Sequence, residues 1–114
     1  MQPPPLKLVV VIASDSDADR LMRRLVDQGY PATKIGSTGG FLRRGNATVL
    51  SGVEEGEVEA VIATVRAECR ARTEHVPLQA LPLFGEGAVL TEPVEVRVGG
   101  AIVFVVAVER FEKT

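Results

Sequence analysis

Two nearly continuous aliphatic runs, one toward each end of the sequence, most restrict what this chain can fold into. Leu6–Ala13 and Ala101–Val108 are rich in valine and isoleucine, and runs of this length predict buried strands. In both runs almost all even and odd positions are apolar, whereas a sheet with one covered face alternates apolar and polar residues. We therefore expect both faces of the sheet to be covered at these two strands.

The residues between these runs predict helices and further strands. Ser14–Asp17 offer several helix N-caps, apolar residues then repeat at helical spacing to Val26, and Gly29 ends the pattern. We interpret the aspartates of this segment as helix caps. A second helix is indicated by a cluster of glutamates followed by an apolar stripe from Val58 to Cys69. The remaining expected strands span Ala32–Ser37, Ala47–Val53 and Val94–Val98.

This order predicts one α+β domain over residues 1–114, ferredoxin-like, with a βαββαβ pattern and an extra strand before the last one. Gly99-Gly100 is expected to form a two-residue hairpin turn, residues 1–5 a disordered tail, and residues 73–92 a long functional loop. Two helices cover only one face of such a sheet, so the other apolar face requires a partner, most simply another copy of the chain. The pattern is compatible with a dimer and with a trimer.

Composition excludes several function classes. The net charge of -2 gives no general attraction to a nucleic-acid polymer or to an anionic membrane, and Leu8–Ala13 is too short to span a bilayer. The single Cys69 rules out an internal disulfide, and together with the lack of a secretory leader it predicts a cytoplasmic protein. With one histidine, His75, and no metal-spaced cluster, we expect neither a catalytic site nor a metal site.

The segment Thr38–Asn46 is the strongest candidate for a binding site. It is longer than a hairpin turn requires, and its three glycines let a ligand approach the backbone closely. Phe41, two arginines and Asn46 add an aromatic face, positive charge and an amide, which suit a ligand with a base and a phosphate. Taken alone, the segment is also compatible with a flexible connection in which Asn46 forms a turn.

With these segments described, the chain resembles the PII-like cyclic di-AMP receptor family of the nitrogen-regulatory PII-like superfamily. The resemblance rests on Ala32-Thr33-Lys34-Ile35, on Thr38–Asn46, on Gly52-Val53 and on the segment from Pro93 to Val105. It implies a homotrimer of ferredoxin-like subunits, ligand sites at the subunit clefts, and the loops 38–46 and 73–92 rearranging when ligand binds. It also implies signal transduction without catalysis. Cyclic di-AMP would be a second-messenger ligand rather than a cofactor, and the signal would pass to an unknown downstream protein.

The resemblance further implies which residues contact the ligand. Phe41 and Leu42 would pack on an adenine, Asn46 would hydrogen-bond it, and Gly52 would leave space beside it. A stacked base contributes about 1–3 kcal/mol, and asparagine both donates to and accepts from adenine. Arg43 or Arg44 would offset the phosphate charges. The implied ligand-binding residues are Thr33, Gly39, Gly40, Phe41, Leu42, Arg43, Asn46 and Gly52.

The sequence also departs from the family pattern. Where these receptors carry an asparagine and an arginine before the second strand, the chain has Gly29 and Pro31. One lost charged contact weakens binding by about 1.5–3 kcal/mol. The alternative prediction is therefore a PII-like trimer that has lost cyclic di-AMP binding and senses another adenine nucleotide or small metabolite. An RNA-binding sheet is a weaker alternative, because Phe104 is the one aromatic residue in its expected strands.

Overall fold

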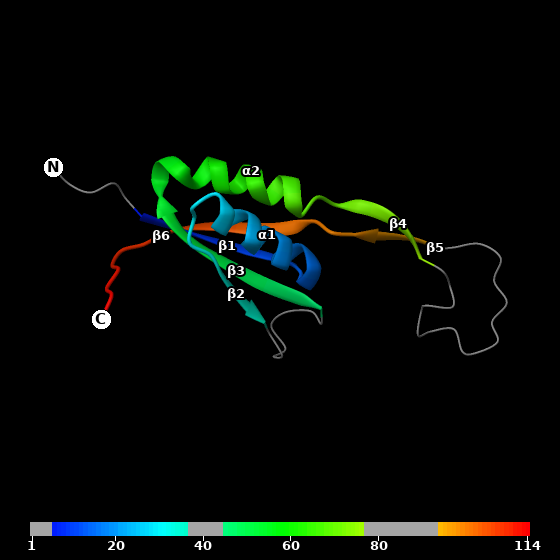
Figure 1. The fold of residues 1–114 in the computed structure, drawn as a ribbon, viewed down its shortest axis with the longest axis horizontal. Helices are drawn as coiled ribbons and strands as arrows, with labels where there is room; N and C mark the ends of the chain where they lie inside the picture. Colours follow the sequence, from blue (N-terminus) through cyan, green and yellow to red (C-terminus); the bar gives the residue numbers. More distant parts are fainter. Residues whose placement is uncertain (1–5, 37–44, 77–93) are drawn as a thin grey trace.

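The computed structural model describes residues 6–36, 45–76 and 94–114, which form two helices and six strands (Figure 1). The expected tail 1–5, most of the loop 38–46 and most of the loop 73–92 lie outside these residues. The elements in chain order are β1 (Leu6–Ser14), α1 (Asp15–Asp27), β2 (Thr33–Gly36), β3 (Asn46–Glu54), a 3-10 turn (Glu55–Glu57), α2 (Val58–Glu68), β4 (Arg72–Val76), β5 (Val94–Val98) and β6 (Ala101–Ala107).

Four of the strands form one antiparallel sheet in the order β2-β3-β1-β6. β1 lies at the centre, paired with β3 from Leu6↔Glu54 to Ser14↔Asn46, and with β6 from Lys7↔Ala107 to Ala13↔Ala101. The two aliphatic runs of the sequence are therefore neighbours. The predicted α+β fold with a βαββαβ element order is confirmed.

Both helices lie on the same face of this sheet (Figure 1), and the hydrophobic core fills the space between the helices and the sheet. α1 begins where Ser14 Oγ accepts a hydrogen bond from the Asp17 backbone N–H at 3.3 Å, which caps the helix. The predicted apolar stripe of α2 is confirmed, since it is buried at four positions and partly buried at Ile62; the buried residues are Val58, Val61, Val65 and Cys69. The main core side chains are Val9, Val11, Leu21, Leu25, Val49, Val53, Val61 and Val65.

The structure corrects the expected loop at residues 73–92, because its first four residues belong to a strand. β4 pairs with β5 from Arg72↔Val98 to Val76↔Val94 and forms a separate two-stranded sheet. Figure 1 shows this ribbon extending away from the four-stranded sheet. The strand owes its conformation to a partner about twenty residues later in the sequence, and no local pattern in residues 72–76 indicates that pairing.

The expected hairpin turn at Gly99-Gly100 is also wrong. β5 and β6 flank these glycines, but β5 pairs with β4 and β6 pairs with β1, so the chain passes from one sheet to the other. Both glycines have positive φ, +80° and +86°. A Cβ atom at Gly99 would stand 2.5 Å from the Arg70 carbonyl oxygen, so a residue without a side chain is required at this junction.

The face of the sheet opposite the helices is apolar, as the sequence predicts. Leu8, Val10 and Ile12 of β1 are half-buried there, and Ile102, Phe104 and Val106 of β6 keep 57%, 53% and 49% of their surface exposed in the single chain. The register sets these three pairs side by side across β1 and β6. We call this surface, with the alternate residues of β3 from Asn46 to Gly52, the open face.

Candidate functional site

The open face carries a hollow of about 530 Å³ at the end of the sheet where β1 begins. Thr33 and Gly52, which the sequence predicts as ligand residues, both line it. They meet because β2 and β1 flank β3: Thr33 is paired with Leu50, and Leu8 is paired with Gly52. Its lining, here called the Thr33 hollow, consists of Leu6, Leu8, Pro31, Ala32, Thr33, Leu50, Gly52, Val108 and Phe111.

The lining of the Thr33 hollow is mostly aliphatic, with the Thr33 hydroxyl as its side-chain polar group. Pro31 is fixed at the rim because its carbonyl oxygen accepts a hydrogen bond from Ser51 Oγ at 2.7 Å. A Cβ atom at Gly52 would meet no atom within 4 Å, so the glycine leaves open space in the wall. A largely apolar hollow of this size with few polar groups is typical of small-molecule sites.

Asn46 lies apart from Thr33 and Gly52. It belongs to the open face, but it is six residues from Gly52 along β3, which corresponds to roughly 20 Å of strand. There it lines a second hollow of about 540 Å³ with Ser14 and the Gly99-Gly100 junction. Within one chain, the structure therefore brings together two of the three predicted ligand residues that it describes. Gly39, Gly40, Phe41, Leu42 and Arg43 lie outside the described residues.

Lys34, beside Thr33 on β2, is engaged by the first turns of α1. Its Nζ atom lies 2.8 Å from an Asp19 carboxylate oxygen and 3.6 Å from Asp15 Oδ1. The hydrogen bond between the Lys34 and Asp19 side chains lowers the pKa of Asp19 and raises the pKa of Lys34. This lysine therefore points to the helix side of the sheet and adds no charge to the Thr33 hollow.

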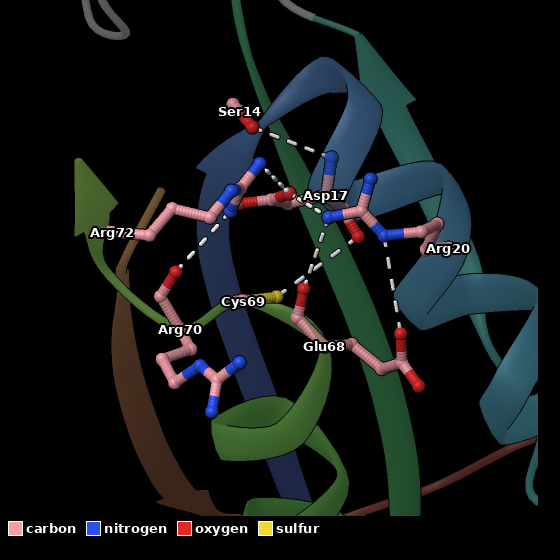
Figure 2. A network of polar contacts seen from close by, with 7 residues as sticks. All are labelled: Ser14, Asp17, Arg20, Glu68, Cys69, Arg70 and Arg72. Carbon is pink, nitrogen blue, oxygen red and sulfur yellow. Dashed lines mark hydrogen bonds and ion pairs between the residues drawn. The ribbon is translucent and has the colours of Figure 1, made fainter. Parts of the chain in front are cut away.

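A buried ion-pair network, which the sequence interpretation missed, joins α1 to the start of β4 (Figure 2). Asp17 is fully buried and forms a short contact with Arg20 Nη2, while Arg72 Nη2 lies 3.4 Å from Asp17 Oδ1 and Arg72 Nη1 lies 3.5 Å from Oδ2. Arg20 Nη2 also donates to the Glu68 carbonyl oxygen at 3.3 Å, and Arg72 Nη1 to that of Arg70 at 3.2 Å.

The interpretation of Asp17 as a helix cap is therefore wrong, since Ser14 supplies the cap and Asp17 points into the protein. A signal for this is present in the sequence. Asp17 stands four residues before Leu21 and eight before Leu25, both buried, so it lies on the apolar stripe of α1. A carboxylate at such a position needs a cationic partner, because a buried unpaired charge is strongly unfavourable.

Cys69 borders this network and is a core residue, as predicted. Its thiol is buried, with Sγ 4.0 Å from the Asp17 carbonyl oxygen. Burial, and then repulsion from the Asp17 carboxylate, raise the pKa of Cys69 to about 11. The thiol is therefore protonated at neutral pH, which makes it a poor nucleophile.

The described part of the chain offers no metal site and no membrane span. Across residues 6–36, 45–76 and 94–114, no three histidine, cysteine, aspartate or glutamate side chains come close enough together to hold a metal ion. None of the helices in these ranges is long and apolar enough to cross a membrane.

Together, the antiparallel sheet, the helices on one face and the apolar hollow on the other define an α+β fold of ferredoxin-like element order with a candidate small-molecule site. The sequence matches the family described as "Cyclic-di-AMP receptor" over residues 6–114, and the chain belongs to this family of receptors. A crystal structure of a functionally unknown protein from Pediococcus pentosaceus ATCC 25745 is similar, with a TM-score of 0.77 and 35% sequence identity. That match covers 98% of this chain and 100% of the other.

Proposed function

We propose that this protein is a non-enzymatic signalling receptor that binds cyclic di-AMP at clefts between the subunits of a homotrimer. The observation that carries the proposal is the Thr33 hollow: Thr33 and Gly52, from different strands, line one apolar cavity of about 530 Å³ on the open face. Membership of the cyclic-di-AMP receptor family supports the choice of ligand.

The chemistry of the hollow suits a purine base. Leu8, Leu50 and the Pro31 ring offer aliphatic surface to the flat faces of an adenine, and the Thr33 hydroxyl offers one hydrogen bond to its edge. β2 ends at Gly36 and β3 begins at Asn46, so residues 37–44 connect these two strands in the sequence. In the proposal, this segment supplies Phe41 and Leu42 as packing groups and Arg43 as a cation for the phosphates.

The open face supports the trimer. Ile102, Phe104 and Val106 are large apolar side chains about half exposed in one chain, and such a contiguous patch typically marks an interface between proteins. A subunit packed against the open face would border the Thr33 hollow, which lies on the same face. Ligand binding between subunits would then change the order of the loops 38–46 and 73–92 and so the affinity for a downstream protein.

The test is an isothermal titration of cyclic di-AMP into the full chain, with cyclic di-GMP and ATP titrated in parallel. We expect saturable binding near one ligand per subunit that is selective for cyclic di-AMP. Selective binding of ATP or another adenine nucleotide instead would favour the alternative trimer, in which Gly29 and Pro31 accompany a changed ligand. An absence of binding by all three nucleotides would contradict cyclic di-AMP as the ligand and would favour the alternative trimer with a small metabolite as its ligand.

A substitution that fills the Thr33 hollow tests whether this hollow is the ligand site. Gly52→Val places a branched side chain into space that is empty around Gly52, and we expect at least a tenfold loss of affinity. Gly56→Val is the matched control, because Gly56 is also open on all sides but lies on the exposed 3-10 turn outside the hollow. Phe41→Ala and Asn46→Ala should also weaken binding while leaving the oligomer intact. Unchanged affinity in all three site variants would contradict the site.

A further inference from the structure

The residues after β6 return to the ligand site. The Val108 backbone N–H donates a hydrogen bond of 3.2 Å to the Leu6 carbonyl oxygen, which holds the chain beside the start of β1. From this anchor, Val108 and Phe111 contribute to the wall of the Thr33 hollow. Residues 109–114 form neither a helix nor a strand, so Phe111 lies in an irregular segment that follows the sheet.

Phe111 is also poorly covered by the rest of the chain. Its side chain keeps 70% of its surface exposed, the highest fraction among the exposed large hydrophobic residues of the described chain. A phenylalanine in water loses the favourable free energy of burial, and its ring face gains most by packing on another flat apolar surface. The ring therefore borders the hollow with surface left for a ligand.

We propose that Phe111 is a second base-stacking residue of the receptor, contributed by the C-terminal segment. This inference rests on the proposed function. Cyclic di-AMP carries two adenines, and the proposed site assigns one of them to Phe41. Phe111 gives the other adenine an aromatic face at the wall of the Thr33 hollow, and base–aromatic stacking is tolerant of the detailed geometry.

The experiment compares cyclic di-AMP titrations of the unmodified protein with those of Phe111→Ala and Phe111→Trp. Loss of one stacked base corresponds to roughly 5- to 150-fold weaker binding in Phe111→Ala. Phe111→Trp keeps an aromatic face and should bind with nearly unchanged affinity. Because the chain contains no tryptophan, this variant has a single tryptophan that can be excited selectively over Tyr30, and we expect the bound adenine to quench its emission.

Val26→Trp is the matched control. Val26 is 55% exposed on α1, on the opposite side of the sheet from the Thr33 hollow, so its emission should not respond to ligand. Neither site is buried, so all variants should fold, and circular dichroism checks this.

The outcomes separate the inference from the function on which it rests. Binding by the unmodified protein with equal affinity in Phe111→Ala overturns the role of Phe111 and leaves the receptor function in place. Weaker binding in Phe111→Ala with unchanged emission from Phe111→Trp at saturating ligand overturns stacking, because the ring would then act without contacting a base. An absence of binding by the unmodified protein overturns the proposed function and the inference together.

Discussion

Asp17 is the residue on which three elements of the protein converge. Its carboxylate lies in α1, Arg20 links it to the end of α2 through the Glu68 carbonyl, and Arg72 links it to β4. The two arginine side chains are 41% and 35% exposed, so their charges are partly solvated while the carboxylate is fully buried. The network therefore fixes geometry more than it adds net stability, since a buried ion pair loses much of its attraction to desolvation.

We expect Asp17→Ala to lower the free energy of unfolding by about 1.5–3 kcal/mol, the range for hydrogen bonds to charged groups. Asp15→Ala is the control in the same turn: Asp15 is exposed and lies 3.6 Å from Lys34, so its removal should cost less than about 1 kcal/mol. Urea unfolding at one fixed protein concentration measures both. Equal losses in the two variants would contradict a special role for the buried carboxylate.

The thiol of Cys69 makes stability depend on pH at the alkaline end. Its pKa rises from 9.0 to about 11 on folding, so between these values the unfolded chain releases a proton that the folded chain keeps. Unfolding is then favoured as pH rises, and the contribution of the thiol is complete below pH 9 and lost through pH 11. We expect the stability advantage of the unmodified protein over Cys69→Ala to shrink across this window in urea unfolding, and a constant difference would contradict the shift.

At the scale of single residues, the sequence predicts which side chains suit a ligand better than it predicts where those side chains lie in the fold. Thr33 and Gly52 were expected at one site, and they do line one hollow. Asn46 lies at the other end of β3 in the same chain, and its assignment to the ligand site stays a prediction, because the expected site lies between subunits. The position of Asp17 on the apolar stripe of α1 indicates its burial, but its partner Arg72 is distant in sequence, so the sequence does not predict this ion pair.

At the scale of elements, β1, α1, β3 and α2 follow from local pattern, whereas β4 does not. The first four have long apolar repeats and clear boundaries, such as the Ser14 cap. β4 is defined by pairing with β5, and the Gly99-Gly100 junction is defined by two sheets meeting. Both errors have one cause: a strand partner chosen by tertiary structure cannot be read from a short segment.

Gly99→Ala tests how the two sheets are joined. Its φ of +80° is unfavourable for alanine, and the added Cβ would stand 2.5 Å from the Arg70 carbonyl oxygen and 2.6 Å from Arg72 Nη1. We expect a loss of about 1–3 kcal/mol and faster hydrogen exchange in β4 and β5. Gly56→Ala, with no atom within 4 Å of its new Cβ, should be neutral or slightly stabilising. Equal effects of the two substitutions would contradict the close approach at the junction.

At the scale of the whole molecule, the open face predicts that chains associate, and the proposed function makes the assembly a trimer. We expect sedimentation equilibrium to give three times the 12.2 kDa of one chain. Phe104→Asp places a charge in the middle of the open face, on a residue already 53% exposed in the single chain, so it should dissociate the trimer without unfolding the subunit. Val26→Asp, at 55% exposure on α1, should remain trimeric. A monomeric unmodified protein would contradict the assembly.

The pairing of β1 with β6 makes the chain suitable for circular permutation. Lys7 is paired with Ala107, and the Val108 backbone N–H donates a hydrogen bond to the Leu6 carbonyl oxygen. The start of β1 and the end of β6 therefore lie side by side. A short linker from the segment after Val108 to Leu6 would close the polypeptide into a ring without changing any strand neighbour. Such a ring reopened at Gly56, on an exposed turn, would be a circular permutant with the same sheet.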